Sequence, residues 1–141
     1  MATGKILKQN KYDAFIKWQD QSVSSGSWAT NVGNNSTFRK PSGEVGTTAY
    51  NLSLDIAGTY LVLYHVNIAA LSTSGLRGVR IYIDDSNVGE EFVAPTGNGT
   101  SCLIGRIVTS TGTTTTRLGV FQSSGSAVTA ADIFIAAIRL D

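Results

Sequence analysis

Few side chains in this chain of 141 residues could carry out catalysis, and the single histidine and single cysteine limit the choice most. One cysteine can form neither a disulfide within the chain nor a cysteine cluster for zinc. A Ser-His-Asp triad would require His65 at a cleft, whereas His65 lies in the middle of an apolar stretch. We therefore expect His65 to pack inside the protein or between subunits, and Cys102 to be a small buried apolar residue. The sequence predicts no enzyme and no cofactor.

Four carboxylates beside one expected hairpin are the candidate metal ligands. Asp84, Asp85, Glu90 and Glu91 could gather oxygen atoms around a calcium ion, which prefers such ligands. Carboxylates next to a turn are more often solvated, so we predict no metal site and keep these four residues as the calcium candidates. A glycosidase would need two carboxylates on opposite sides of a cleft, a placement that the sequence does not establish.

The balance of charge excludes several classes of partner. The chain has 11 Lys and Arg residues against 10 Asp and Glu residues, which gives a formal net charge of +1. Nucleic-acid binding and attachment to an acidic membrane surface both require a clustered positive excess, so neither is expected. No apolar run has the length of a secretion signal or of a membrane-spanning helix. We therefore expect synthesis in a cytoplasm, without a signal peptide and without membrane insertion.

The elements that hold these residues are expected to be strands. The 16 Thr, 15 Ser and 15 Gly residues favour β structure with many turns over helix. Apolar and polar residues alternate between turn signals that recur roughly every ten positions, which predicts about eight to ten strands. This spacing is typical of an all-β, antiparallel jelly-roll sandwich. The expected strands lie near Trp28 and at 50–56, 59–70, 79–84, 88–93, 101–109, 115–122 and 132–140.

Two of the expected strands, 59–70 and 132–140, are apolar on both faces. A sandwich strand normally has one face in the core and the other toward water, and a large exposed apolar sheet is rarely tolerated on a monomer. Either loops or further copies of the chain must therefore cover the second face, and the lack of a spare helix favours further copies. We predict an obligate oligomer with an interface that contains Leu61, Leu63, His65, Ile133, Ile135 and Ala137.

Three segments resemble the trimeric jelly-roll domains of the complement globular heads and of tumour necrosis factor. AGTYLV at 57–62 is similar to the Gly-x-Tyr strand of that family, residues 79–86 are similar to its hairpin strand, and residues 132–140 to its last strand. The resemblance covers about residues 45–141. It departs from the family pattern at Asp85-Ser86, where Asn-Gly is common, and in having no collagen-like stalk. The resemblance implies a homotrimer with 57–62 and 132–140 in the inner sheet.

Bacteriophage virion proteins often carry such domains, and this sequence resembles them more than the secreted animal members because it lacks a secretion signal. We predict a non-enzymatic, homotrimeric protein of the virion surface. A capsid decoration or head-fibre role is favoured over a tail-fibre head, since no long stalk is present. The expected partners are copies of the chain itself and other virion proteins such as the major capsid protein.

Residues 1–20 are expected to form an N-terminal arm, followed by one jelly-roll domain over residues 21–141. The arm is predicted to dock on the particle, with an ordinary first strand as the alternative. A second hypothesis is a receptor-binding tail-fibre head that binds a host-surface glycan through loops at 84–91, 95–100 and 110–114, and a third is a small jelly-roll enzyme. The docking residues would be Lys5, Lys8, Lys11, Tyr12, Phe15 and Trp18.

Overall fold

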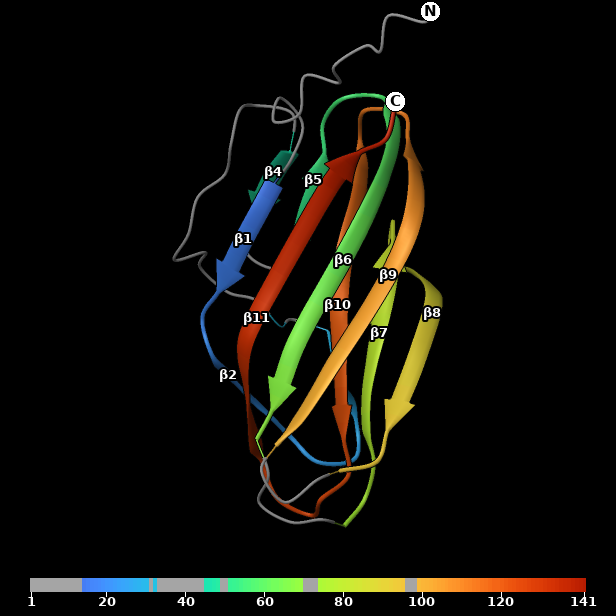
Figure 1. The fold of residues 1–141 in the computed structure, drawn as a ribbon. Coiled ribbons are helices and arrows are strands. Elements are labelled where there is room, and N and C mark those ends of the chain that lie inside the picture. Colours follow the sequence, from blue (N-terminus) through green and yellow to red (C-terminus); the bar gives the residue numbers. More distant parts are fainter. Residues whose placement is uncertain (1–13, 31, 33–44, 49–50, 70–73, 96–98) are drawn as a thin grey trace, which may run out of the picture.

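The computed structural model describes residues 14–30, 32, 45–48, 51–69, 74–95 and 99–141, which form two antiparallel β-sheets packed face to face (Figure 1). These residues contain no helix, and hence none long and apolar enough to cross a bilayer. The predicted all-β, antiparallel sandwich is therefore confirmed.

The first sheet has the strand order β1-β11-β6-β9, and β2 pairs with another part of β11. β6 pairs with β9 along its whole length and with β11 on its other side, so β6 is the middle strand of a three-strand surface. The strands of this sheet are β1 (Ala14–Trp18), β2 (Gln21–Val23), β6 (Gly58–Ile68), β9 (Thr100–Ser110) and β11 (Val128–Arg139).

The second sheet has the order β4-β5-β10-β7-β8, and β3 pairs with β10. β7 and β8 form a hairpin, whereas β10 joins β7 to β5 from a distant part of the sequence. Because β9 lies in the first sheet and β10 in the second, the chain crosses from one sheet to the other, as is typical of a jelly roll. The strands are β3 (Trp28–Ala29), β4 (Val45–Thr48), β5 (Asn51–Leu54), β7 (Arg77–Ile83), β8 (Ser86–Val93) and β10 (Thr114–Gln122).

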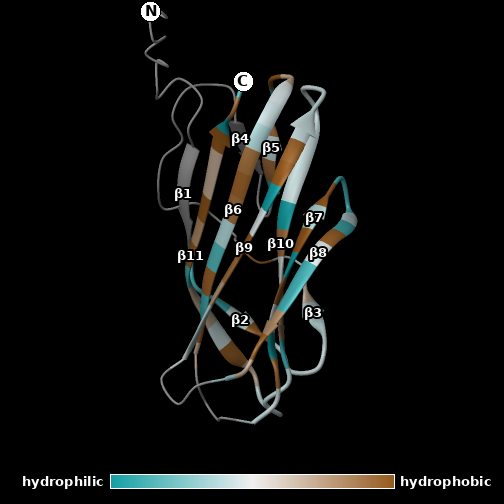
Figure 2. Cartoon of the chain, turned by 45° about the vertical axis from the view of Figure 1, so that its right-hand side comes forward, coloured by the Kyte–Doolittle hydropathy of each residue, from teal (hydrophilic) through white to brown (hydrophobic). Residues whose placement is uncertain are grey.

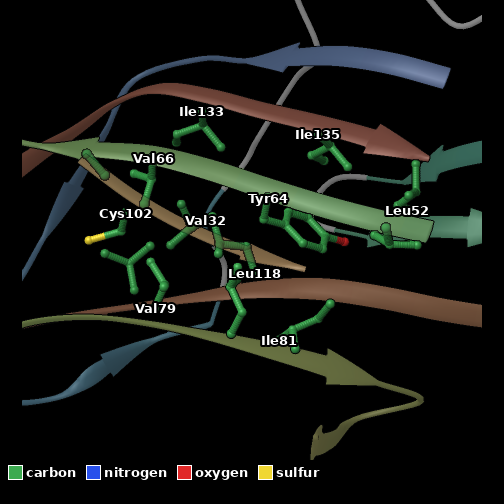
Figure 3. Packing of buried hydrophobic residues seen from close by; sticks show 14 of the residues in the cluster. Val32, Leu52, Tyr64, Val66, Val79, Ile81, Cys102, Leu118, Ile133 and Ile135 are labelled. Carbon is green, nitrogen blue, oxygen red and sulfur yellow. The ribbon is translucent and has the colours of Figure 1, made fainter. Parts of the chain in front are cut away.

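The core lies between the two sheets and is formed by alternate residues of the long strands. On β6, Val62, Tyr64 and Val66 are fully buried, while the residues between them are half-buried on the opposite face. Figure 3 shows Tyr64 pointing into the interior toward Leu118 and Ile81 of the other sheet. Burial on β6 therefore alternates with the period of two that strand geometry imposes.

An irregularity in β11 corrects part of the predicted interface. The pairing of β11 with β6 shifts between Ala131 and Phe134, and buried positions then fall at Ile133, Ile135 and Ala137. All three side chains have zero exposure inside the chain's own core, so the prediction that they form an intersubunit interface is wrong. Figure 3 shows Ile133 and Ile135 within this core. Both faces of this strand are apolar, and alternation alone cannot tell which face is inside.

The segment assigned to the N-terminal arm contains one strand of the domain. Residues 14–18 form β1, which pairs antiparallel with residues 133–137 of β11. Phe15 and Trp18 lie on this strand, whereas Lys5, Lys8, Lys11 and Tyr12 lie outside the described residues. The alternative of an ordinary first strand therefore holds for residues 14–18, and docking by the arm stays a prediction.

Candidate interaction surface

The outward face of β11, β6 and β9 carries three rows of mostly apolar side chains. Directly paired residues of neighbouring antiparallel strands point to the same face, so the register defines each row. Brown, hydrophobic segments run along β11, β6 and β9 in Figure 2, whereas β8 is largely teal. Read from β11 through β6 to β9, the rows are Phe134–His65–Leu103, Ala136–Leu63–Gly105 and Ile138–Leu61–Ile107.

The β9 side of this surface is the most exposed. Ile107 is 68% exposed and Leu103 is 56% exposed, the two highest values among the large apolar side chains that the structure describes. Gly105 lies between them, and the side chain of Leu63 extends over it, because a Cβ at position 105 would lie 2.5 Å from Leu63 Cδ2. The missing side chain at Gly105 thus leaves a level surface between Ile107 and Leu103.

Polar residues border the three rows at both ends. Asn67 pairs with Ser101 beyond the His65 row, and Thr59 pairs with Thr109 beyond the Leu61 row. An apolar centre with a polar border is the arrangement found at protein–protein interfaces. We use the term three-row face for the nine positions of the rows.

The sequence identified only part of this face. Leu61, Leu63 and His65 were predicted to lie at an interface, and the structure places all three on the outward face as half-buried residues. The contribution of β9 was missed, and on β11 the prediction named buried residues in place of the outward ones. Leu103 and Ile107 could have been found, because they lie on the same face of a predicted strand as the polar residues Ser101 and Thr109. The residues of the three-row face that the sequence did not identify, apart from Gly105, are Leu103, Ile107, Phe134, Ala136 and Ile138.

His65 is held in a defined orientation within the three-row face. Its Nδ1 atom lies 3.0 Å from the backbone carbonyl oxygen of Asp132, at the irregularity in β11. Its ring lies 6.0 Å from that of Phe134, centroid to centroid. No second imidazole exists in the chain, and the described residues contain no group of three metal-ligating side chains. This environment fits a packed surface histidine.

The four calcium candidates do not converge on one point. Asp84 Oδ1 accepts a hydrogen bond of 2.8 Å from the Thr115 amide, Asp85 pairs with Arg117 at 3.0 Å, and Glu90 pairs with Arg80. Glu91 lies opposite Val79 rather than beside these groups. The candidate carboxylates are thus distributed among separate protein partners, which does not provide the clustered oxygen ligands that calcium needs.

Trp28 packs within an aromatic cluster on the second sheet. Its ring centroid lies 5.7 Å from that of Phe92 and 5.4 Å from that of Phe121, and the Arg80 guanidinium lies 3.9 Å from its centroid. A Cβ at Gly78 would lie 2.8 Å from the Phe92 ring, so the glycine gives the rings room against the sheet. Trp28 therefore packs against two aromatic rings and one guanidinium group.

The comparisons with known proteins agree with this architecture. No protein-family model and no curated protein matches the sequence. The vertex protein P5 of bacteriophage PRD1 is similar in structure, with a TM-score of 0.67 over 93% of this chain and 98% of that chain at 13% identity. Eiger, a tumour necrosis factor of S. frugiperda, gives 0.63 over 94% of each chain at 11% identity. The globular domain of zebrafish complement 1qA gives 0.58 over 92% of this chain and 96% of that chain at 7% identity.

These likenesses extend over nearly the whole chain and define the class of fold. The chain has a jelly roll of the tumour necrosis factor and complement globular-head type. The resemblance carried by residues 57–62, 79–86 and 132–140 is confirmed at the level of the fold. One protein with this fold, the PRD1 vertex protein, belongs to a bacteriophage particle.

Proposed function

We propose that this chain is a non-enzymatic structural protein of a bacteriophage virion, which assembles as a homotrimer through the three-row face. The observation that carries the proposal is the exposed apolar surface of β11, β6 and β9, on which Ile107 and Leu103 are more than half exposed. Copies of one chain usually associate around a closed symmetry axis, and a face of this kind is stable in water only when it is covered.

The fold supports a trimer rather than another closed assembly. The sequence resembles the trimeric jelly rolls of the complement and tumour necrosis factor group, in which the strands corresponding to β6 and β11 lie in the inner sheet. The three-row face is the outward surface of that sheet in this chain. Trimer formation would bury the leucines and isoleucines of β6, β9 and β11 against other copies.

The virion location is proposed on the likeness to PRD1 vertex protein P5. A vertex protein belongs to the capsid, so we favour a capsid decoration or head-fibre role over the receptor-binding head of a tail fibre. The proposed partners are copies of the chain and other virion proteins, such as the major capsid protein. The sequence prediction that residues 1–20 take part in docking belongs to this proposal.

The self-association is tested by the mass of the purified protein in solution. Light scattering after gel filtration at micromolar concentration should give about 45 kDa, three copies of 14.9 kDa. Ile107→Lys places a charge at the most exposed apolar position of the proposed contact and should reduce the mass to that of one chain. A wild-type mass of one chain at every concentration up to 100 μM would contradict the trimer.

Leu76→Lys is the matched control, because Leu76 is also apolar and 51% exposed but lies outside the three-row face. This variant should keep the mass of the wild type. The virion role is tested separately, by adding the protein to purified particles that lack it. Binding to particles in the absence of glycans supports decoration, whereas binding of the isolated protein to host-cell glycans, with no binding to particles, would instead support the tail-fibre head.

A further inference from the structure

The orientation of His65 has a consequence for how the proposed trimer responds to pH. This inference rests on the proposed self-association through the three-row face. Of the nine positions in that face, His65 is the only one with a titratable side chain. It occupies the middle strand, with Phe134 beside it on β11 and Leu103 beside it on β9.

The hydrogen bond to Asp132 determines which ring nitrogen of His65 gains a proton in acid. A backbone carbonyl oxygen only accepts hydrogen bonds, so Nδ1, at 3.0 Å from it, must carry the hydrogen and donate. In the neutral ring Nε2 is then the unprotonated nitrogen. Protonation therefore takes place at Nε2 and adds a positive charge without breaking the bond to Asp132.

The residues beside His65 on β9 and β6 bring no negative charge to that ring. On β9 its neighbours are Leu103, Ser101 and Gly105, and the one cation of that strand, Arg106, donates its guanidinium hydrogens to the Val88 carbonyl on β8. On its own strand the flanking outward residues are Leu63 and Asn67.

The third neighbouring strand, β11, presents Phe134 and the exposed residue Asp132. Asp132 is the one carboxylate on the strands packed directly against His65 at this point. One strand further, Lys17 of β1 holds the register position opposite Phe134.

We propose that acid dissociates the assembly, because protonation of His65 places an imidazolium in a contact between apolar surfaces. Burial of a charge among apolar groups is unfavourable, whereas a neutral imidazole is tolerated. The separated chains expose His65 to water, where the charged form is stable. Association should thus be strongest above the pH range in which imidazoles ordinarily titrate and should weaken as the pH falls through that range, roughly from 7 to 5.5.

The experiment measures the apparent dissociation constant by sedimentation at pH 8.0, 7.0, 6.0 and 5.5 and constant ionic strength. For the wild type we expect the constant to rise at least about tenfold between pH 8.0 and 5.5, the effect of one unit in the pKa of one group. His65→Leu removes the titrating group and His65→Gln keeps a polar side chain that does not titrate. For each variant the apparent dissociation constant should be the same at all four pH values. Circular dichroism at each pH verifies that the chain remains folded.

Each outcome bears on a different part of the argument. A single-chain mass at every pH overturns the proposed self-association itself. A trimer whose dissociation constant is the same at pH 8.0 and 5.5 leaves the proposed function standing and overturns acid sensitivity. Equal pH dependence in the wild type, His65→Leu and His65→Gln overturns the role of His65, since another group must then be responsible.

Discussion

The hydroxyl groups of Tyr64 on β6 and Thr116 on β10 share a hydrogen bond across the core, which gives the two sheets a polar contact among apolar side chains. Tyr64 is fully buried and Thr116 is 1% exposed. Burial raises the pKa of the Tyr64 phenol above its usual range, and the hydrogen bond with Thr116 opposes this rise in part. The phenol thus stays protonated at any pH at which the protein is studied.

Removal of both partners of this bond should lower the free energy of unfolding by less than the two single removals added together. Tyr64→Phe leaves the buried Thr116 hydroxyl without the phenol and should lower the free energy of unfolding by about 1–3 kcal/mol. Thr116→Val should have a cost in the same range. The double variant should lose about 1 kcal/mol less than the sum, as the coupling in a urea-denaturation cycle measures. Strict additivity would show that the two hydroxyls do not stabilise each other.

Gly75 occupies a position that no other residue can fill without displacing the chain. Its φ is +78°, and a Cβ there would lie 2.2 Å from the Ser123 backbone oxygen. Gly125 is a matched control, since its φ is +93° but a Cβ would meet nothing within 4 Å. Both alanine variants should lose about 1 kcal/mol of unfolding free energy, because alanine disfavours left-handed backbone. Gly75→Ala must in addition displace the backbone at Ser123. We expect thermal unfolding to show the larger loss for Gly75→Ala, and equal losses would contradict the steric argument.

The long strands were predictable because each keeps a regular alternation that burial imposes. The predicted segments 59–70, 101–109 and 115–122 correspond to β6 at 58–68, β9 at 100–110 and β10 at 114–122. β2 and β4 were missed because strands of three or four residues contain too few alternations to be told from a loop. β1 was given only as the alternative to a docking arm, because AFIKW does not alternate strictly and its pairing with β11 is a tertiary contact.

The sequence predicted the residues of the three-row face on β6 but not those on β11, because the buried face of β11 changes along the strand. In that strand the buried positions are even-numbered at Val128 and Ala130 and odd-numbered from Ile133 onward. The change of phase occurs at Asp132, with a φ of +47°, where the pairing with β6 is irregular. A sequence that is apolar at both parities does not reveal such a shift. On β6, where polar His65 and Asn67 mark one face, the outward side was predicted correctly.

The thiol of Cys102 should be unreactive in the folded protein. Cys102 is 1% exposed, and burial, together with the nearby Glu91 carboxylate, raises its pKa to about 11. Since the thiolate is the reactive form, reaction with an aromatic disulfide reagent at pH 8 should be at least about 100-fold slower than for the urea-unfolded chain. Ser126→Cys, at an exposed turn position, provides a second thiol that should react at once. Rapid reaction of two thiols in the folded variant would contradict the burial of Cys102.

The hairpin between β7 and β8 depends on Asp84 through both its backbone and its carboxylate. Ile83 pairs with Ser86, so Asp84 and Asp85 form a two-residue turn, with φ values of 46° and 65° that match a type I′ turn. Asp84 Oδ1 also accepts a hydrogen bond from the Thr115 amide at 2.8 Å, which links the turn to β10. Asp84→Ala loses this acceptor and the local preference for left-handed backbone, and should lower the free energy of unfolding by about 1–2 kcal/mol.

Asp84→Asn is the control that separates these contacts from charge and from metal binding. Asparagine tolerates left-handed backbone and retains an acceptor oxygen, so the free energy of unfolding should change by less than about 0.5 kcal/mol. Because Asp84, Asp85 and Glu90 contact separate protein groups, millimolar calcium should raise the melting temperature of neither the wild type nor this variant. A calcium-dependent rise that is lost in Asp84→Asn would instead establish Asp84 as a metal ligand. The charge-neutral variant therefore distinguishes a turn held by hydrogen bonds from one held by an ion.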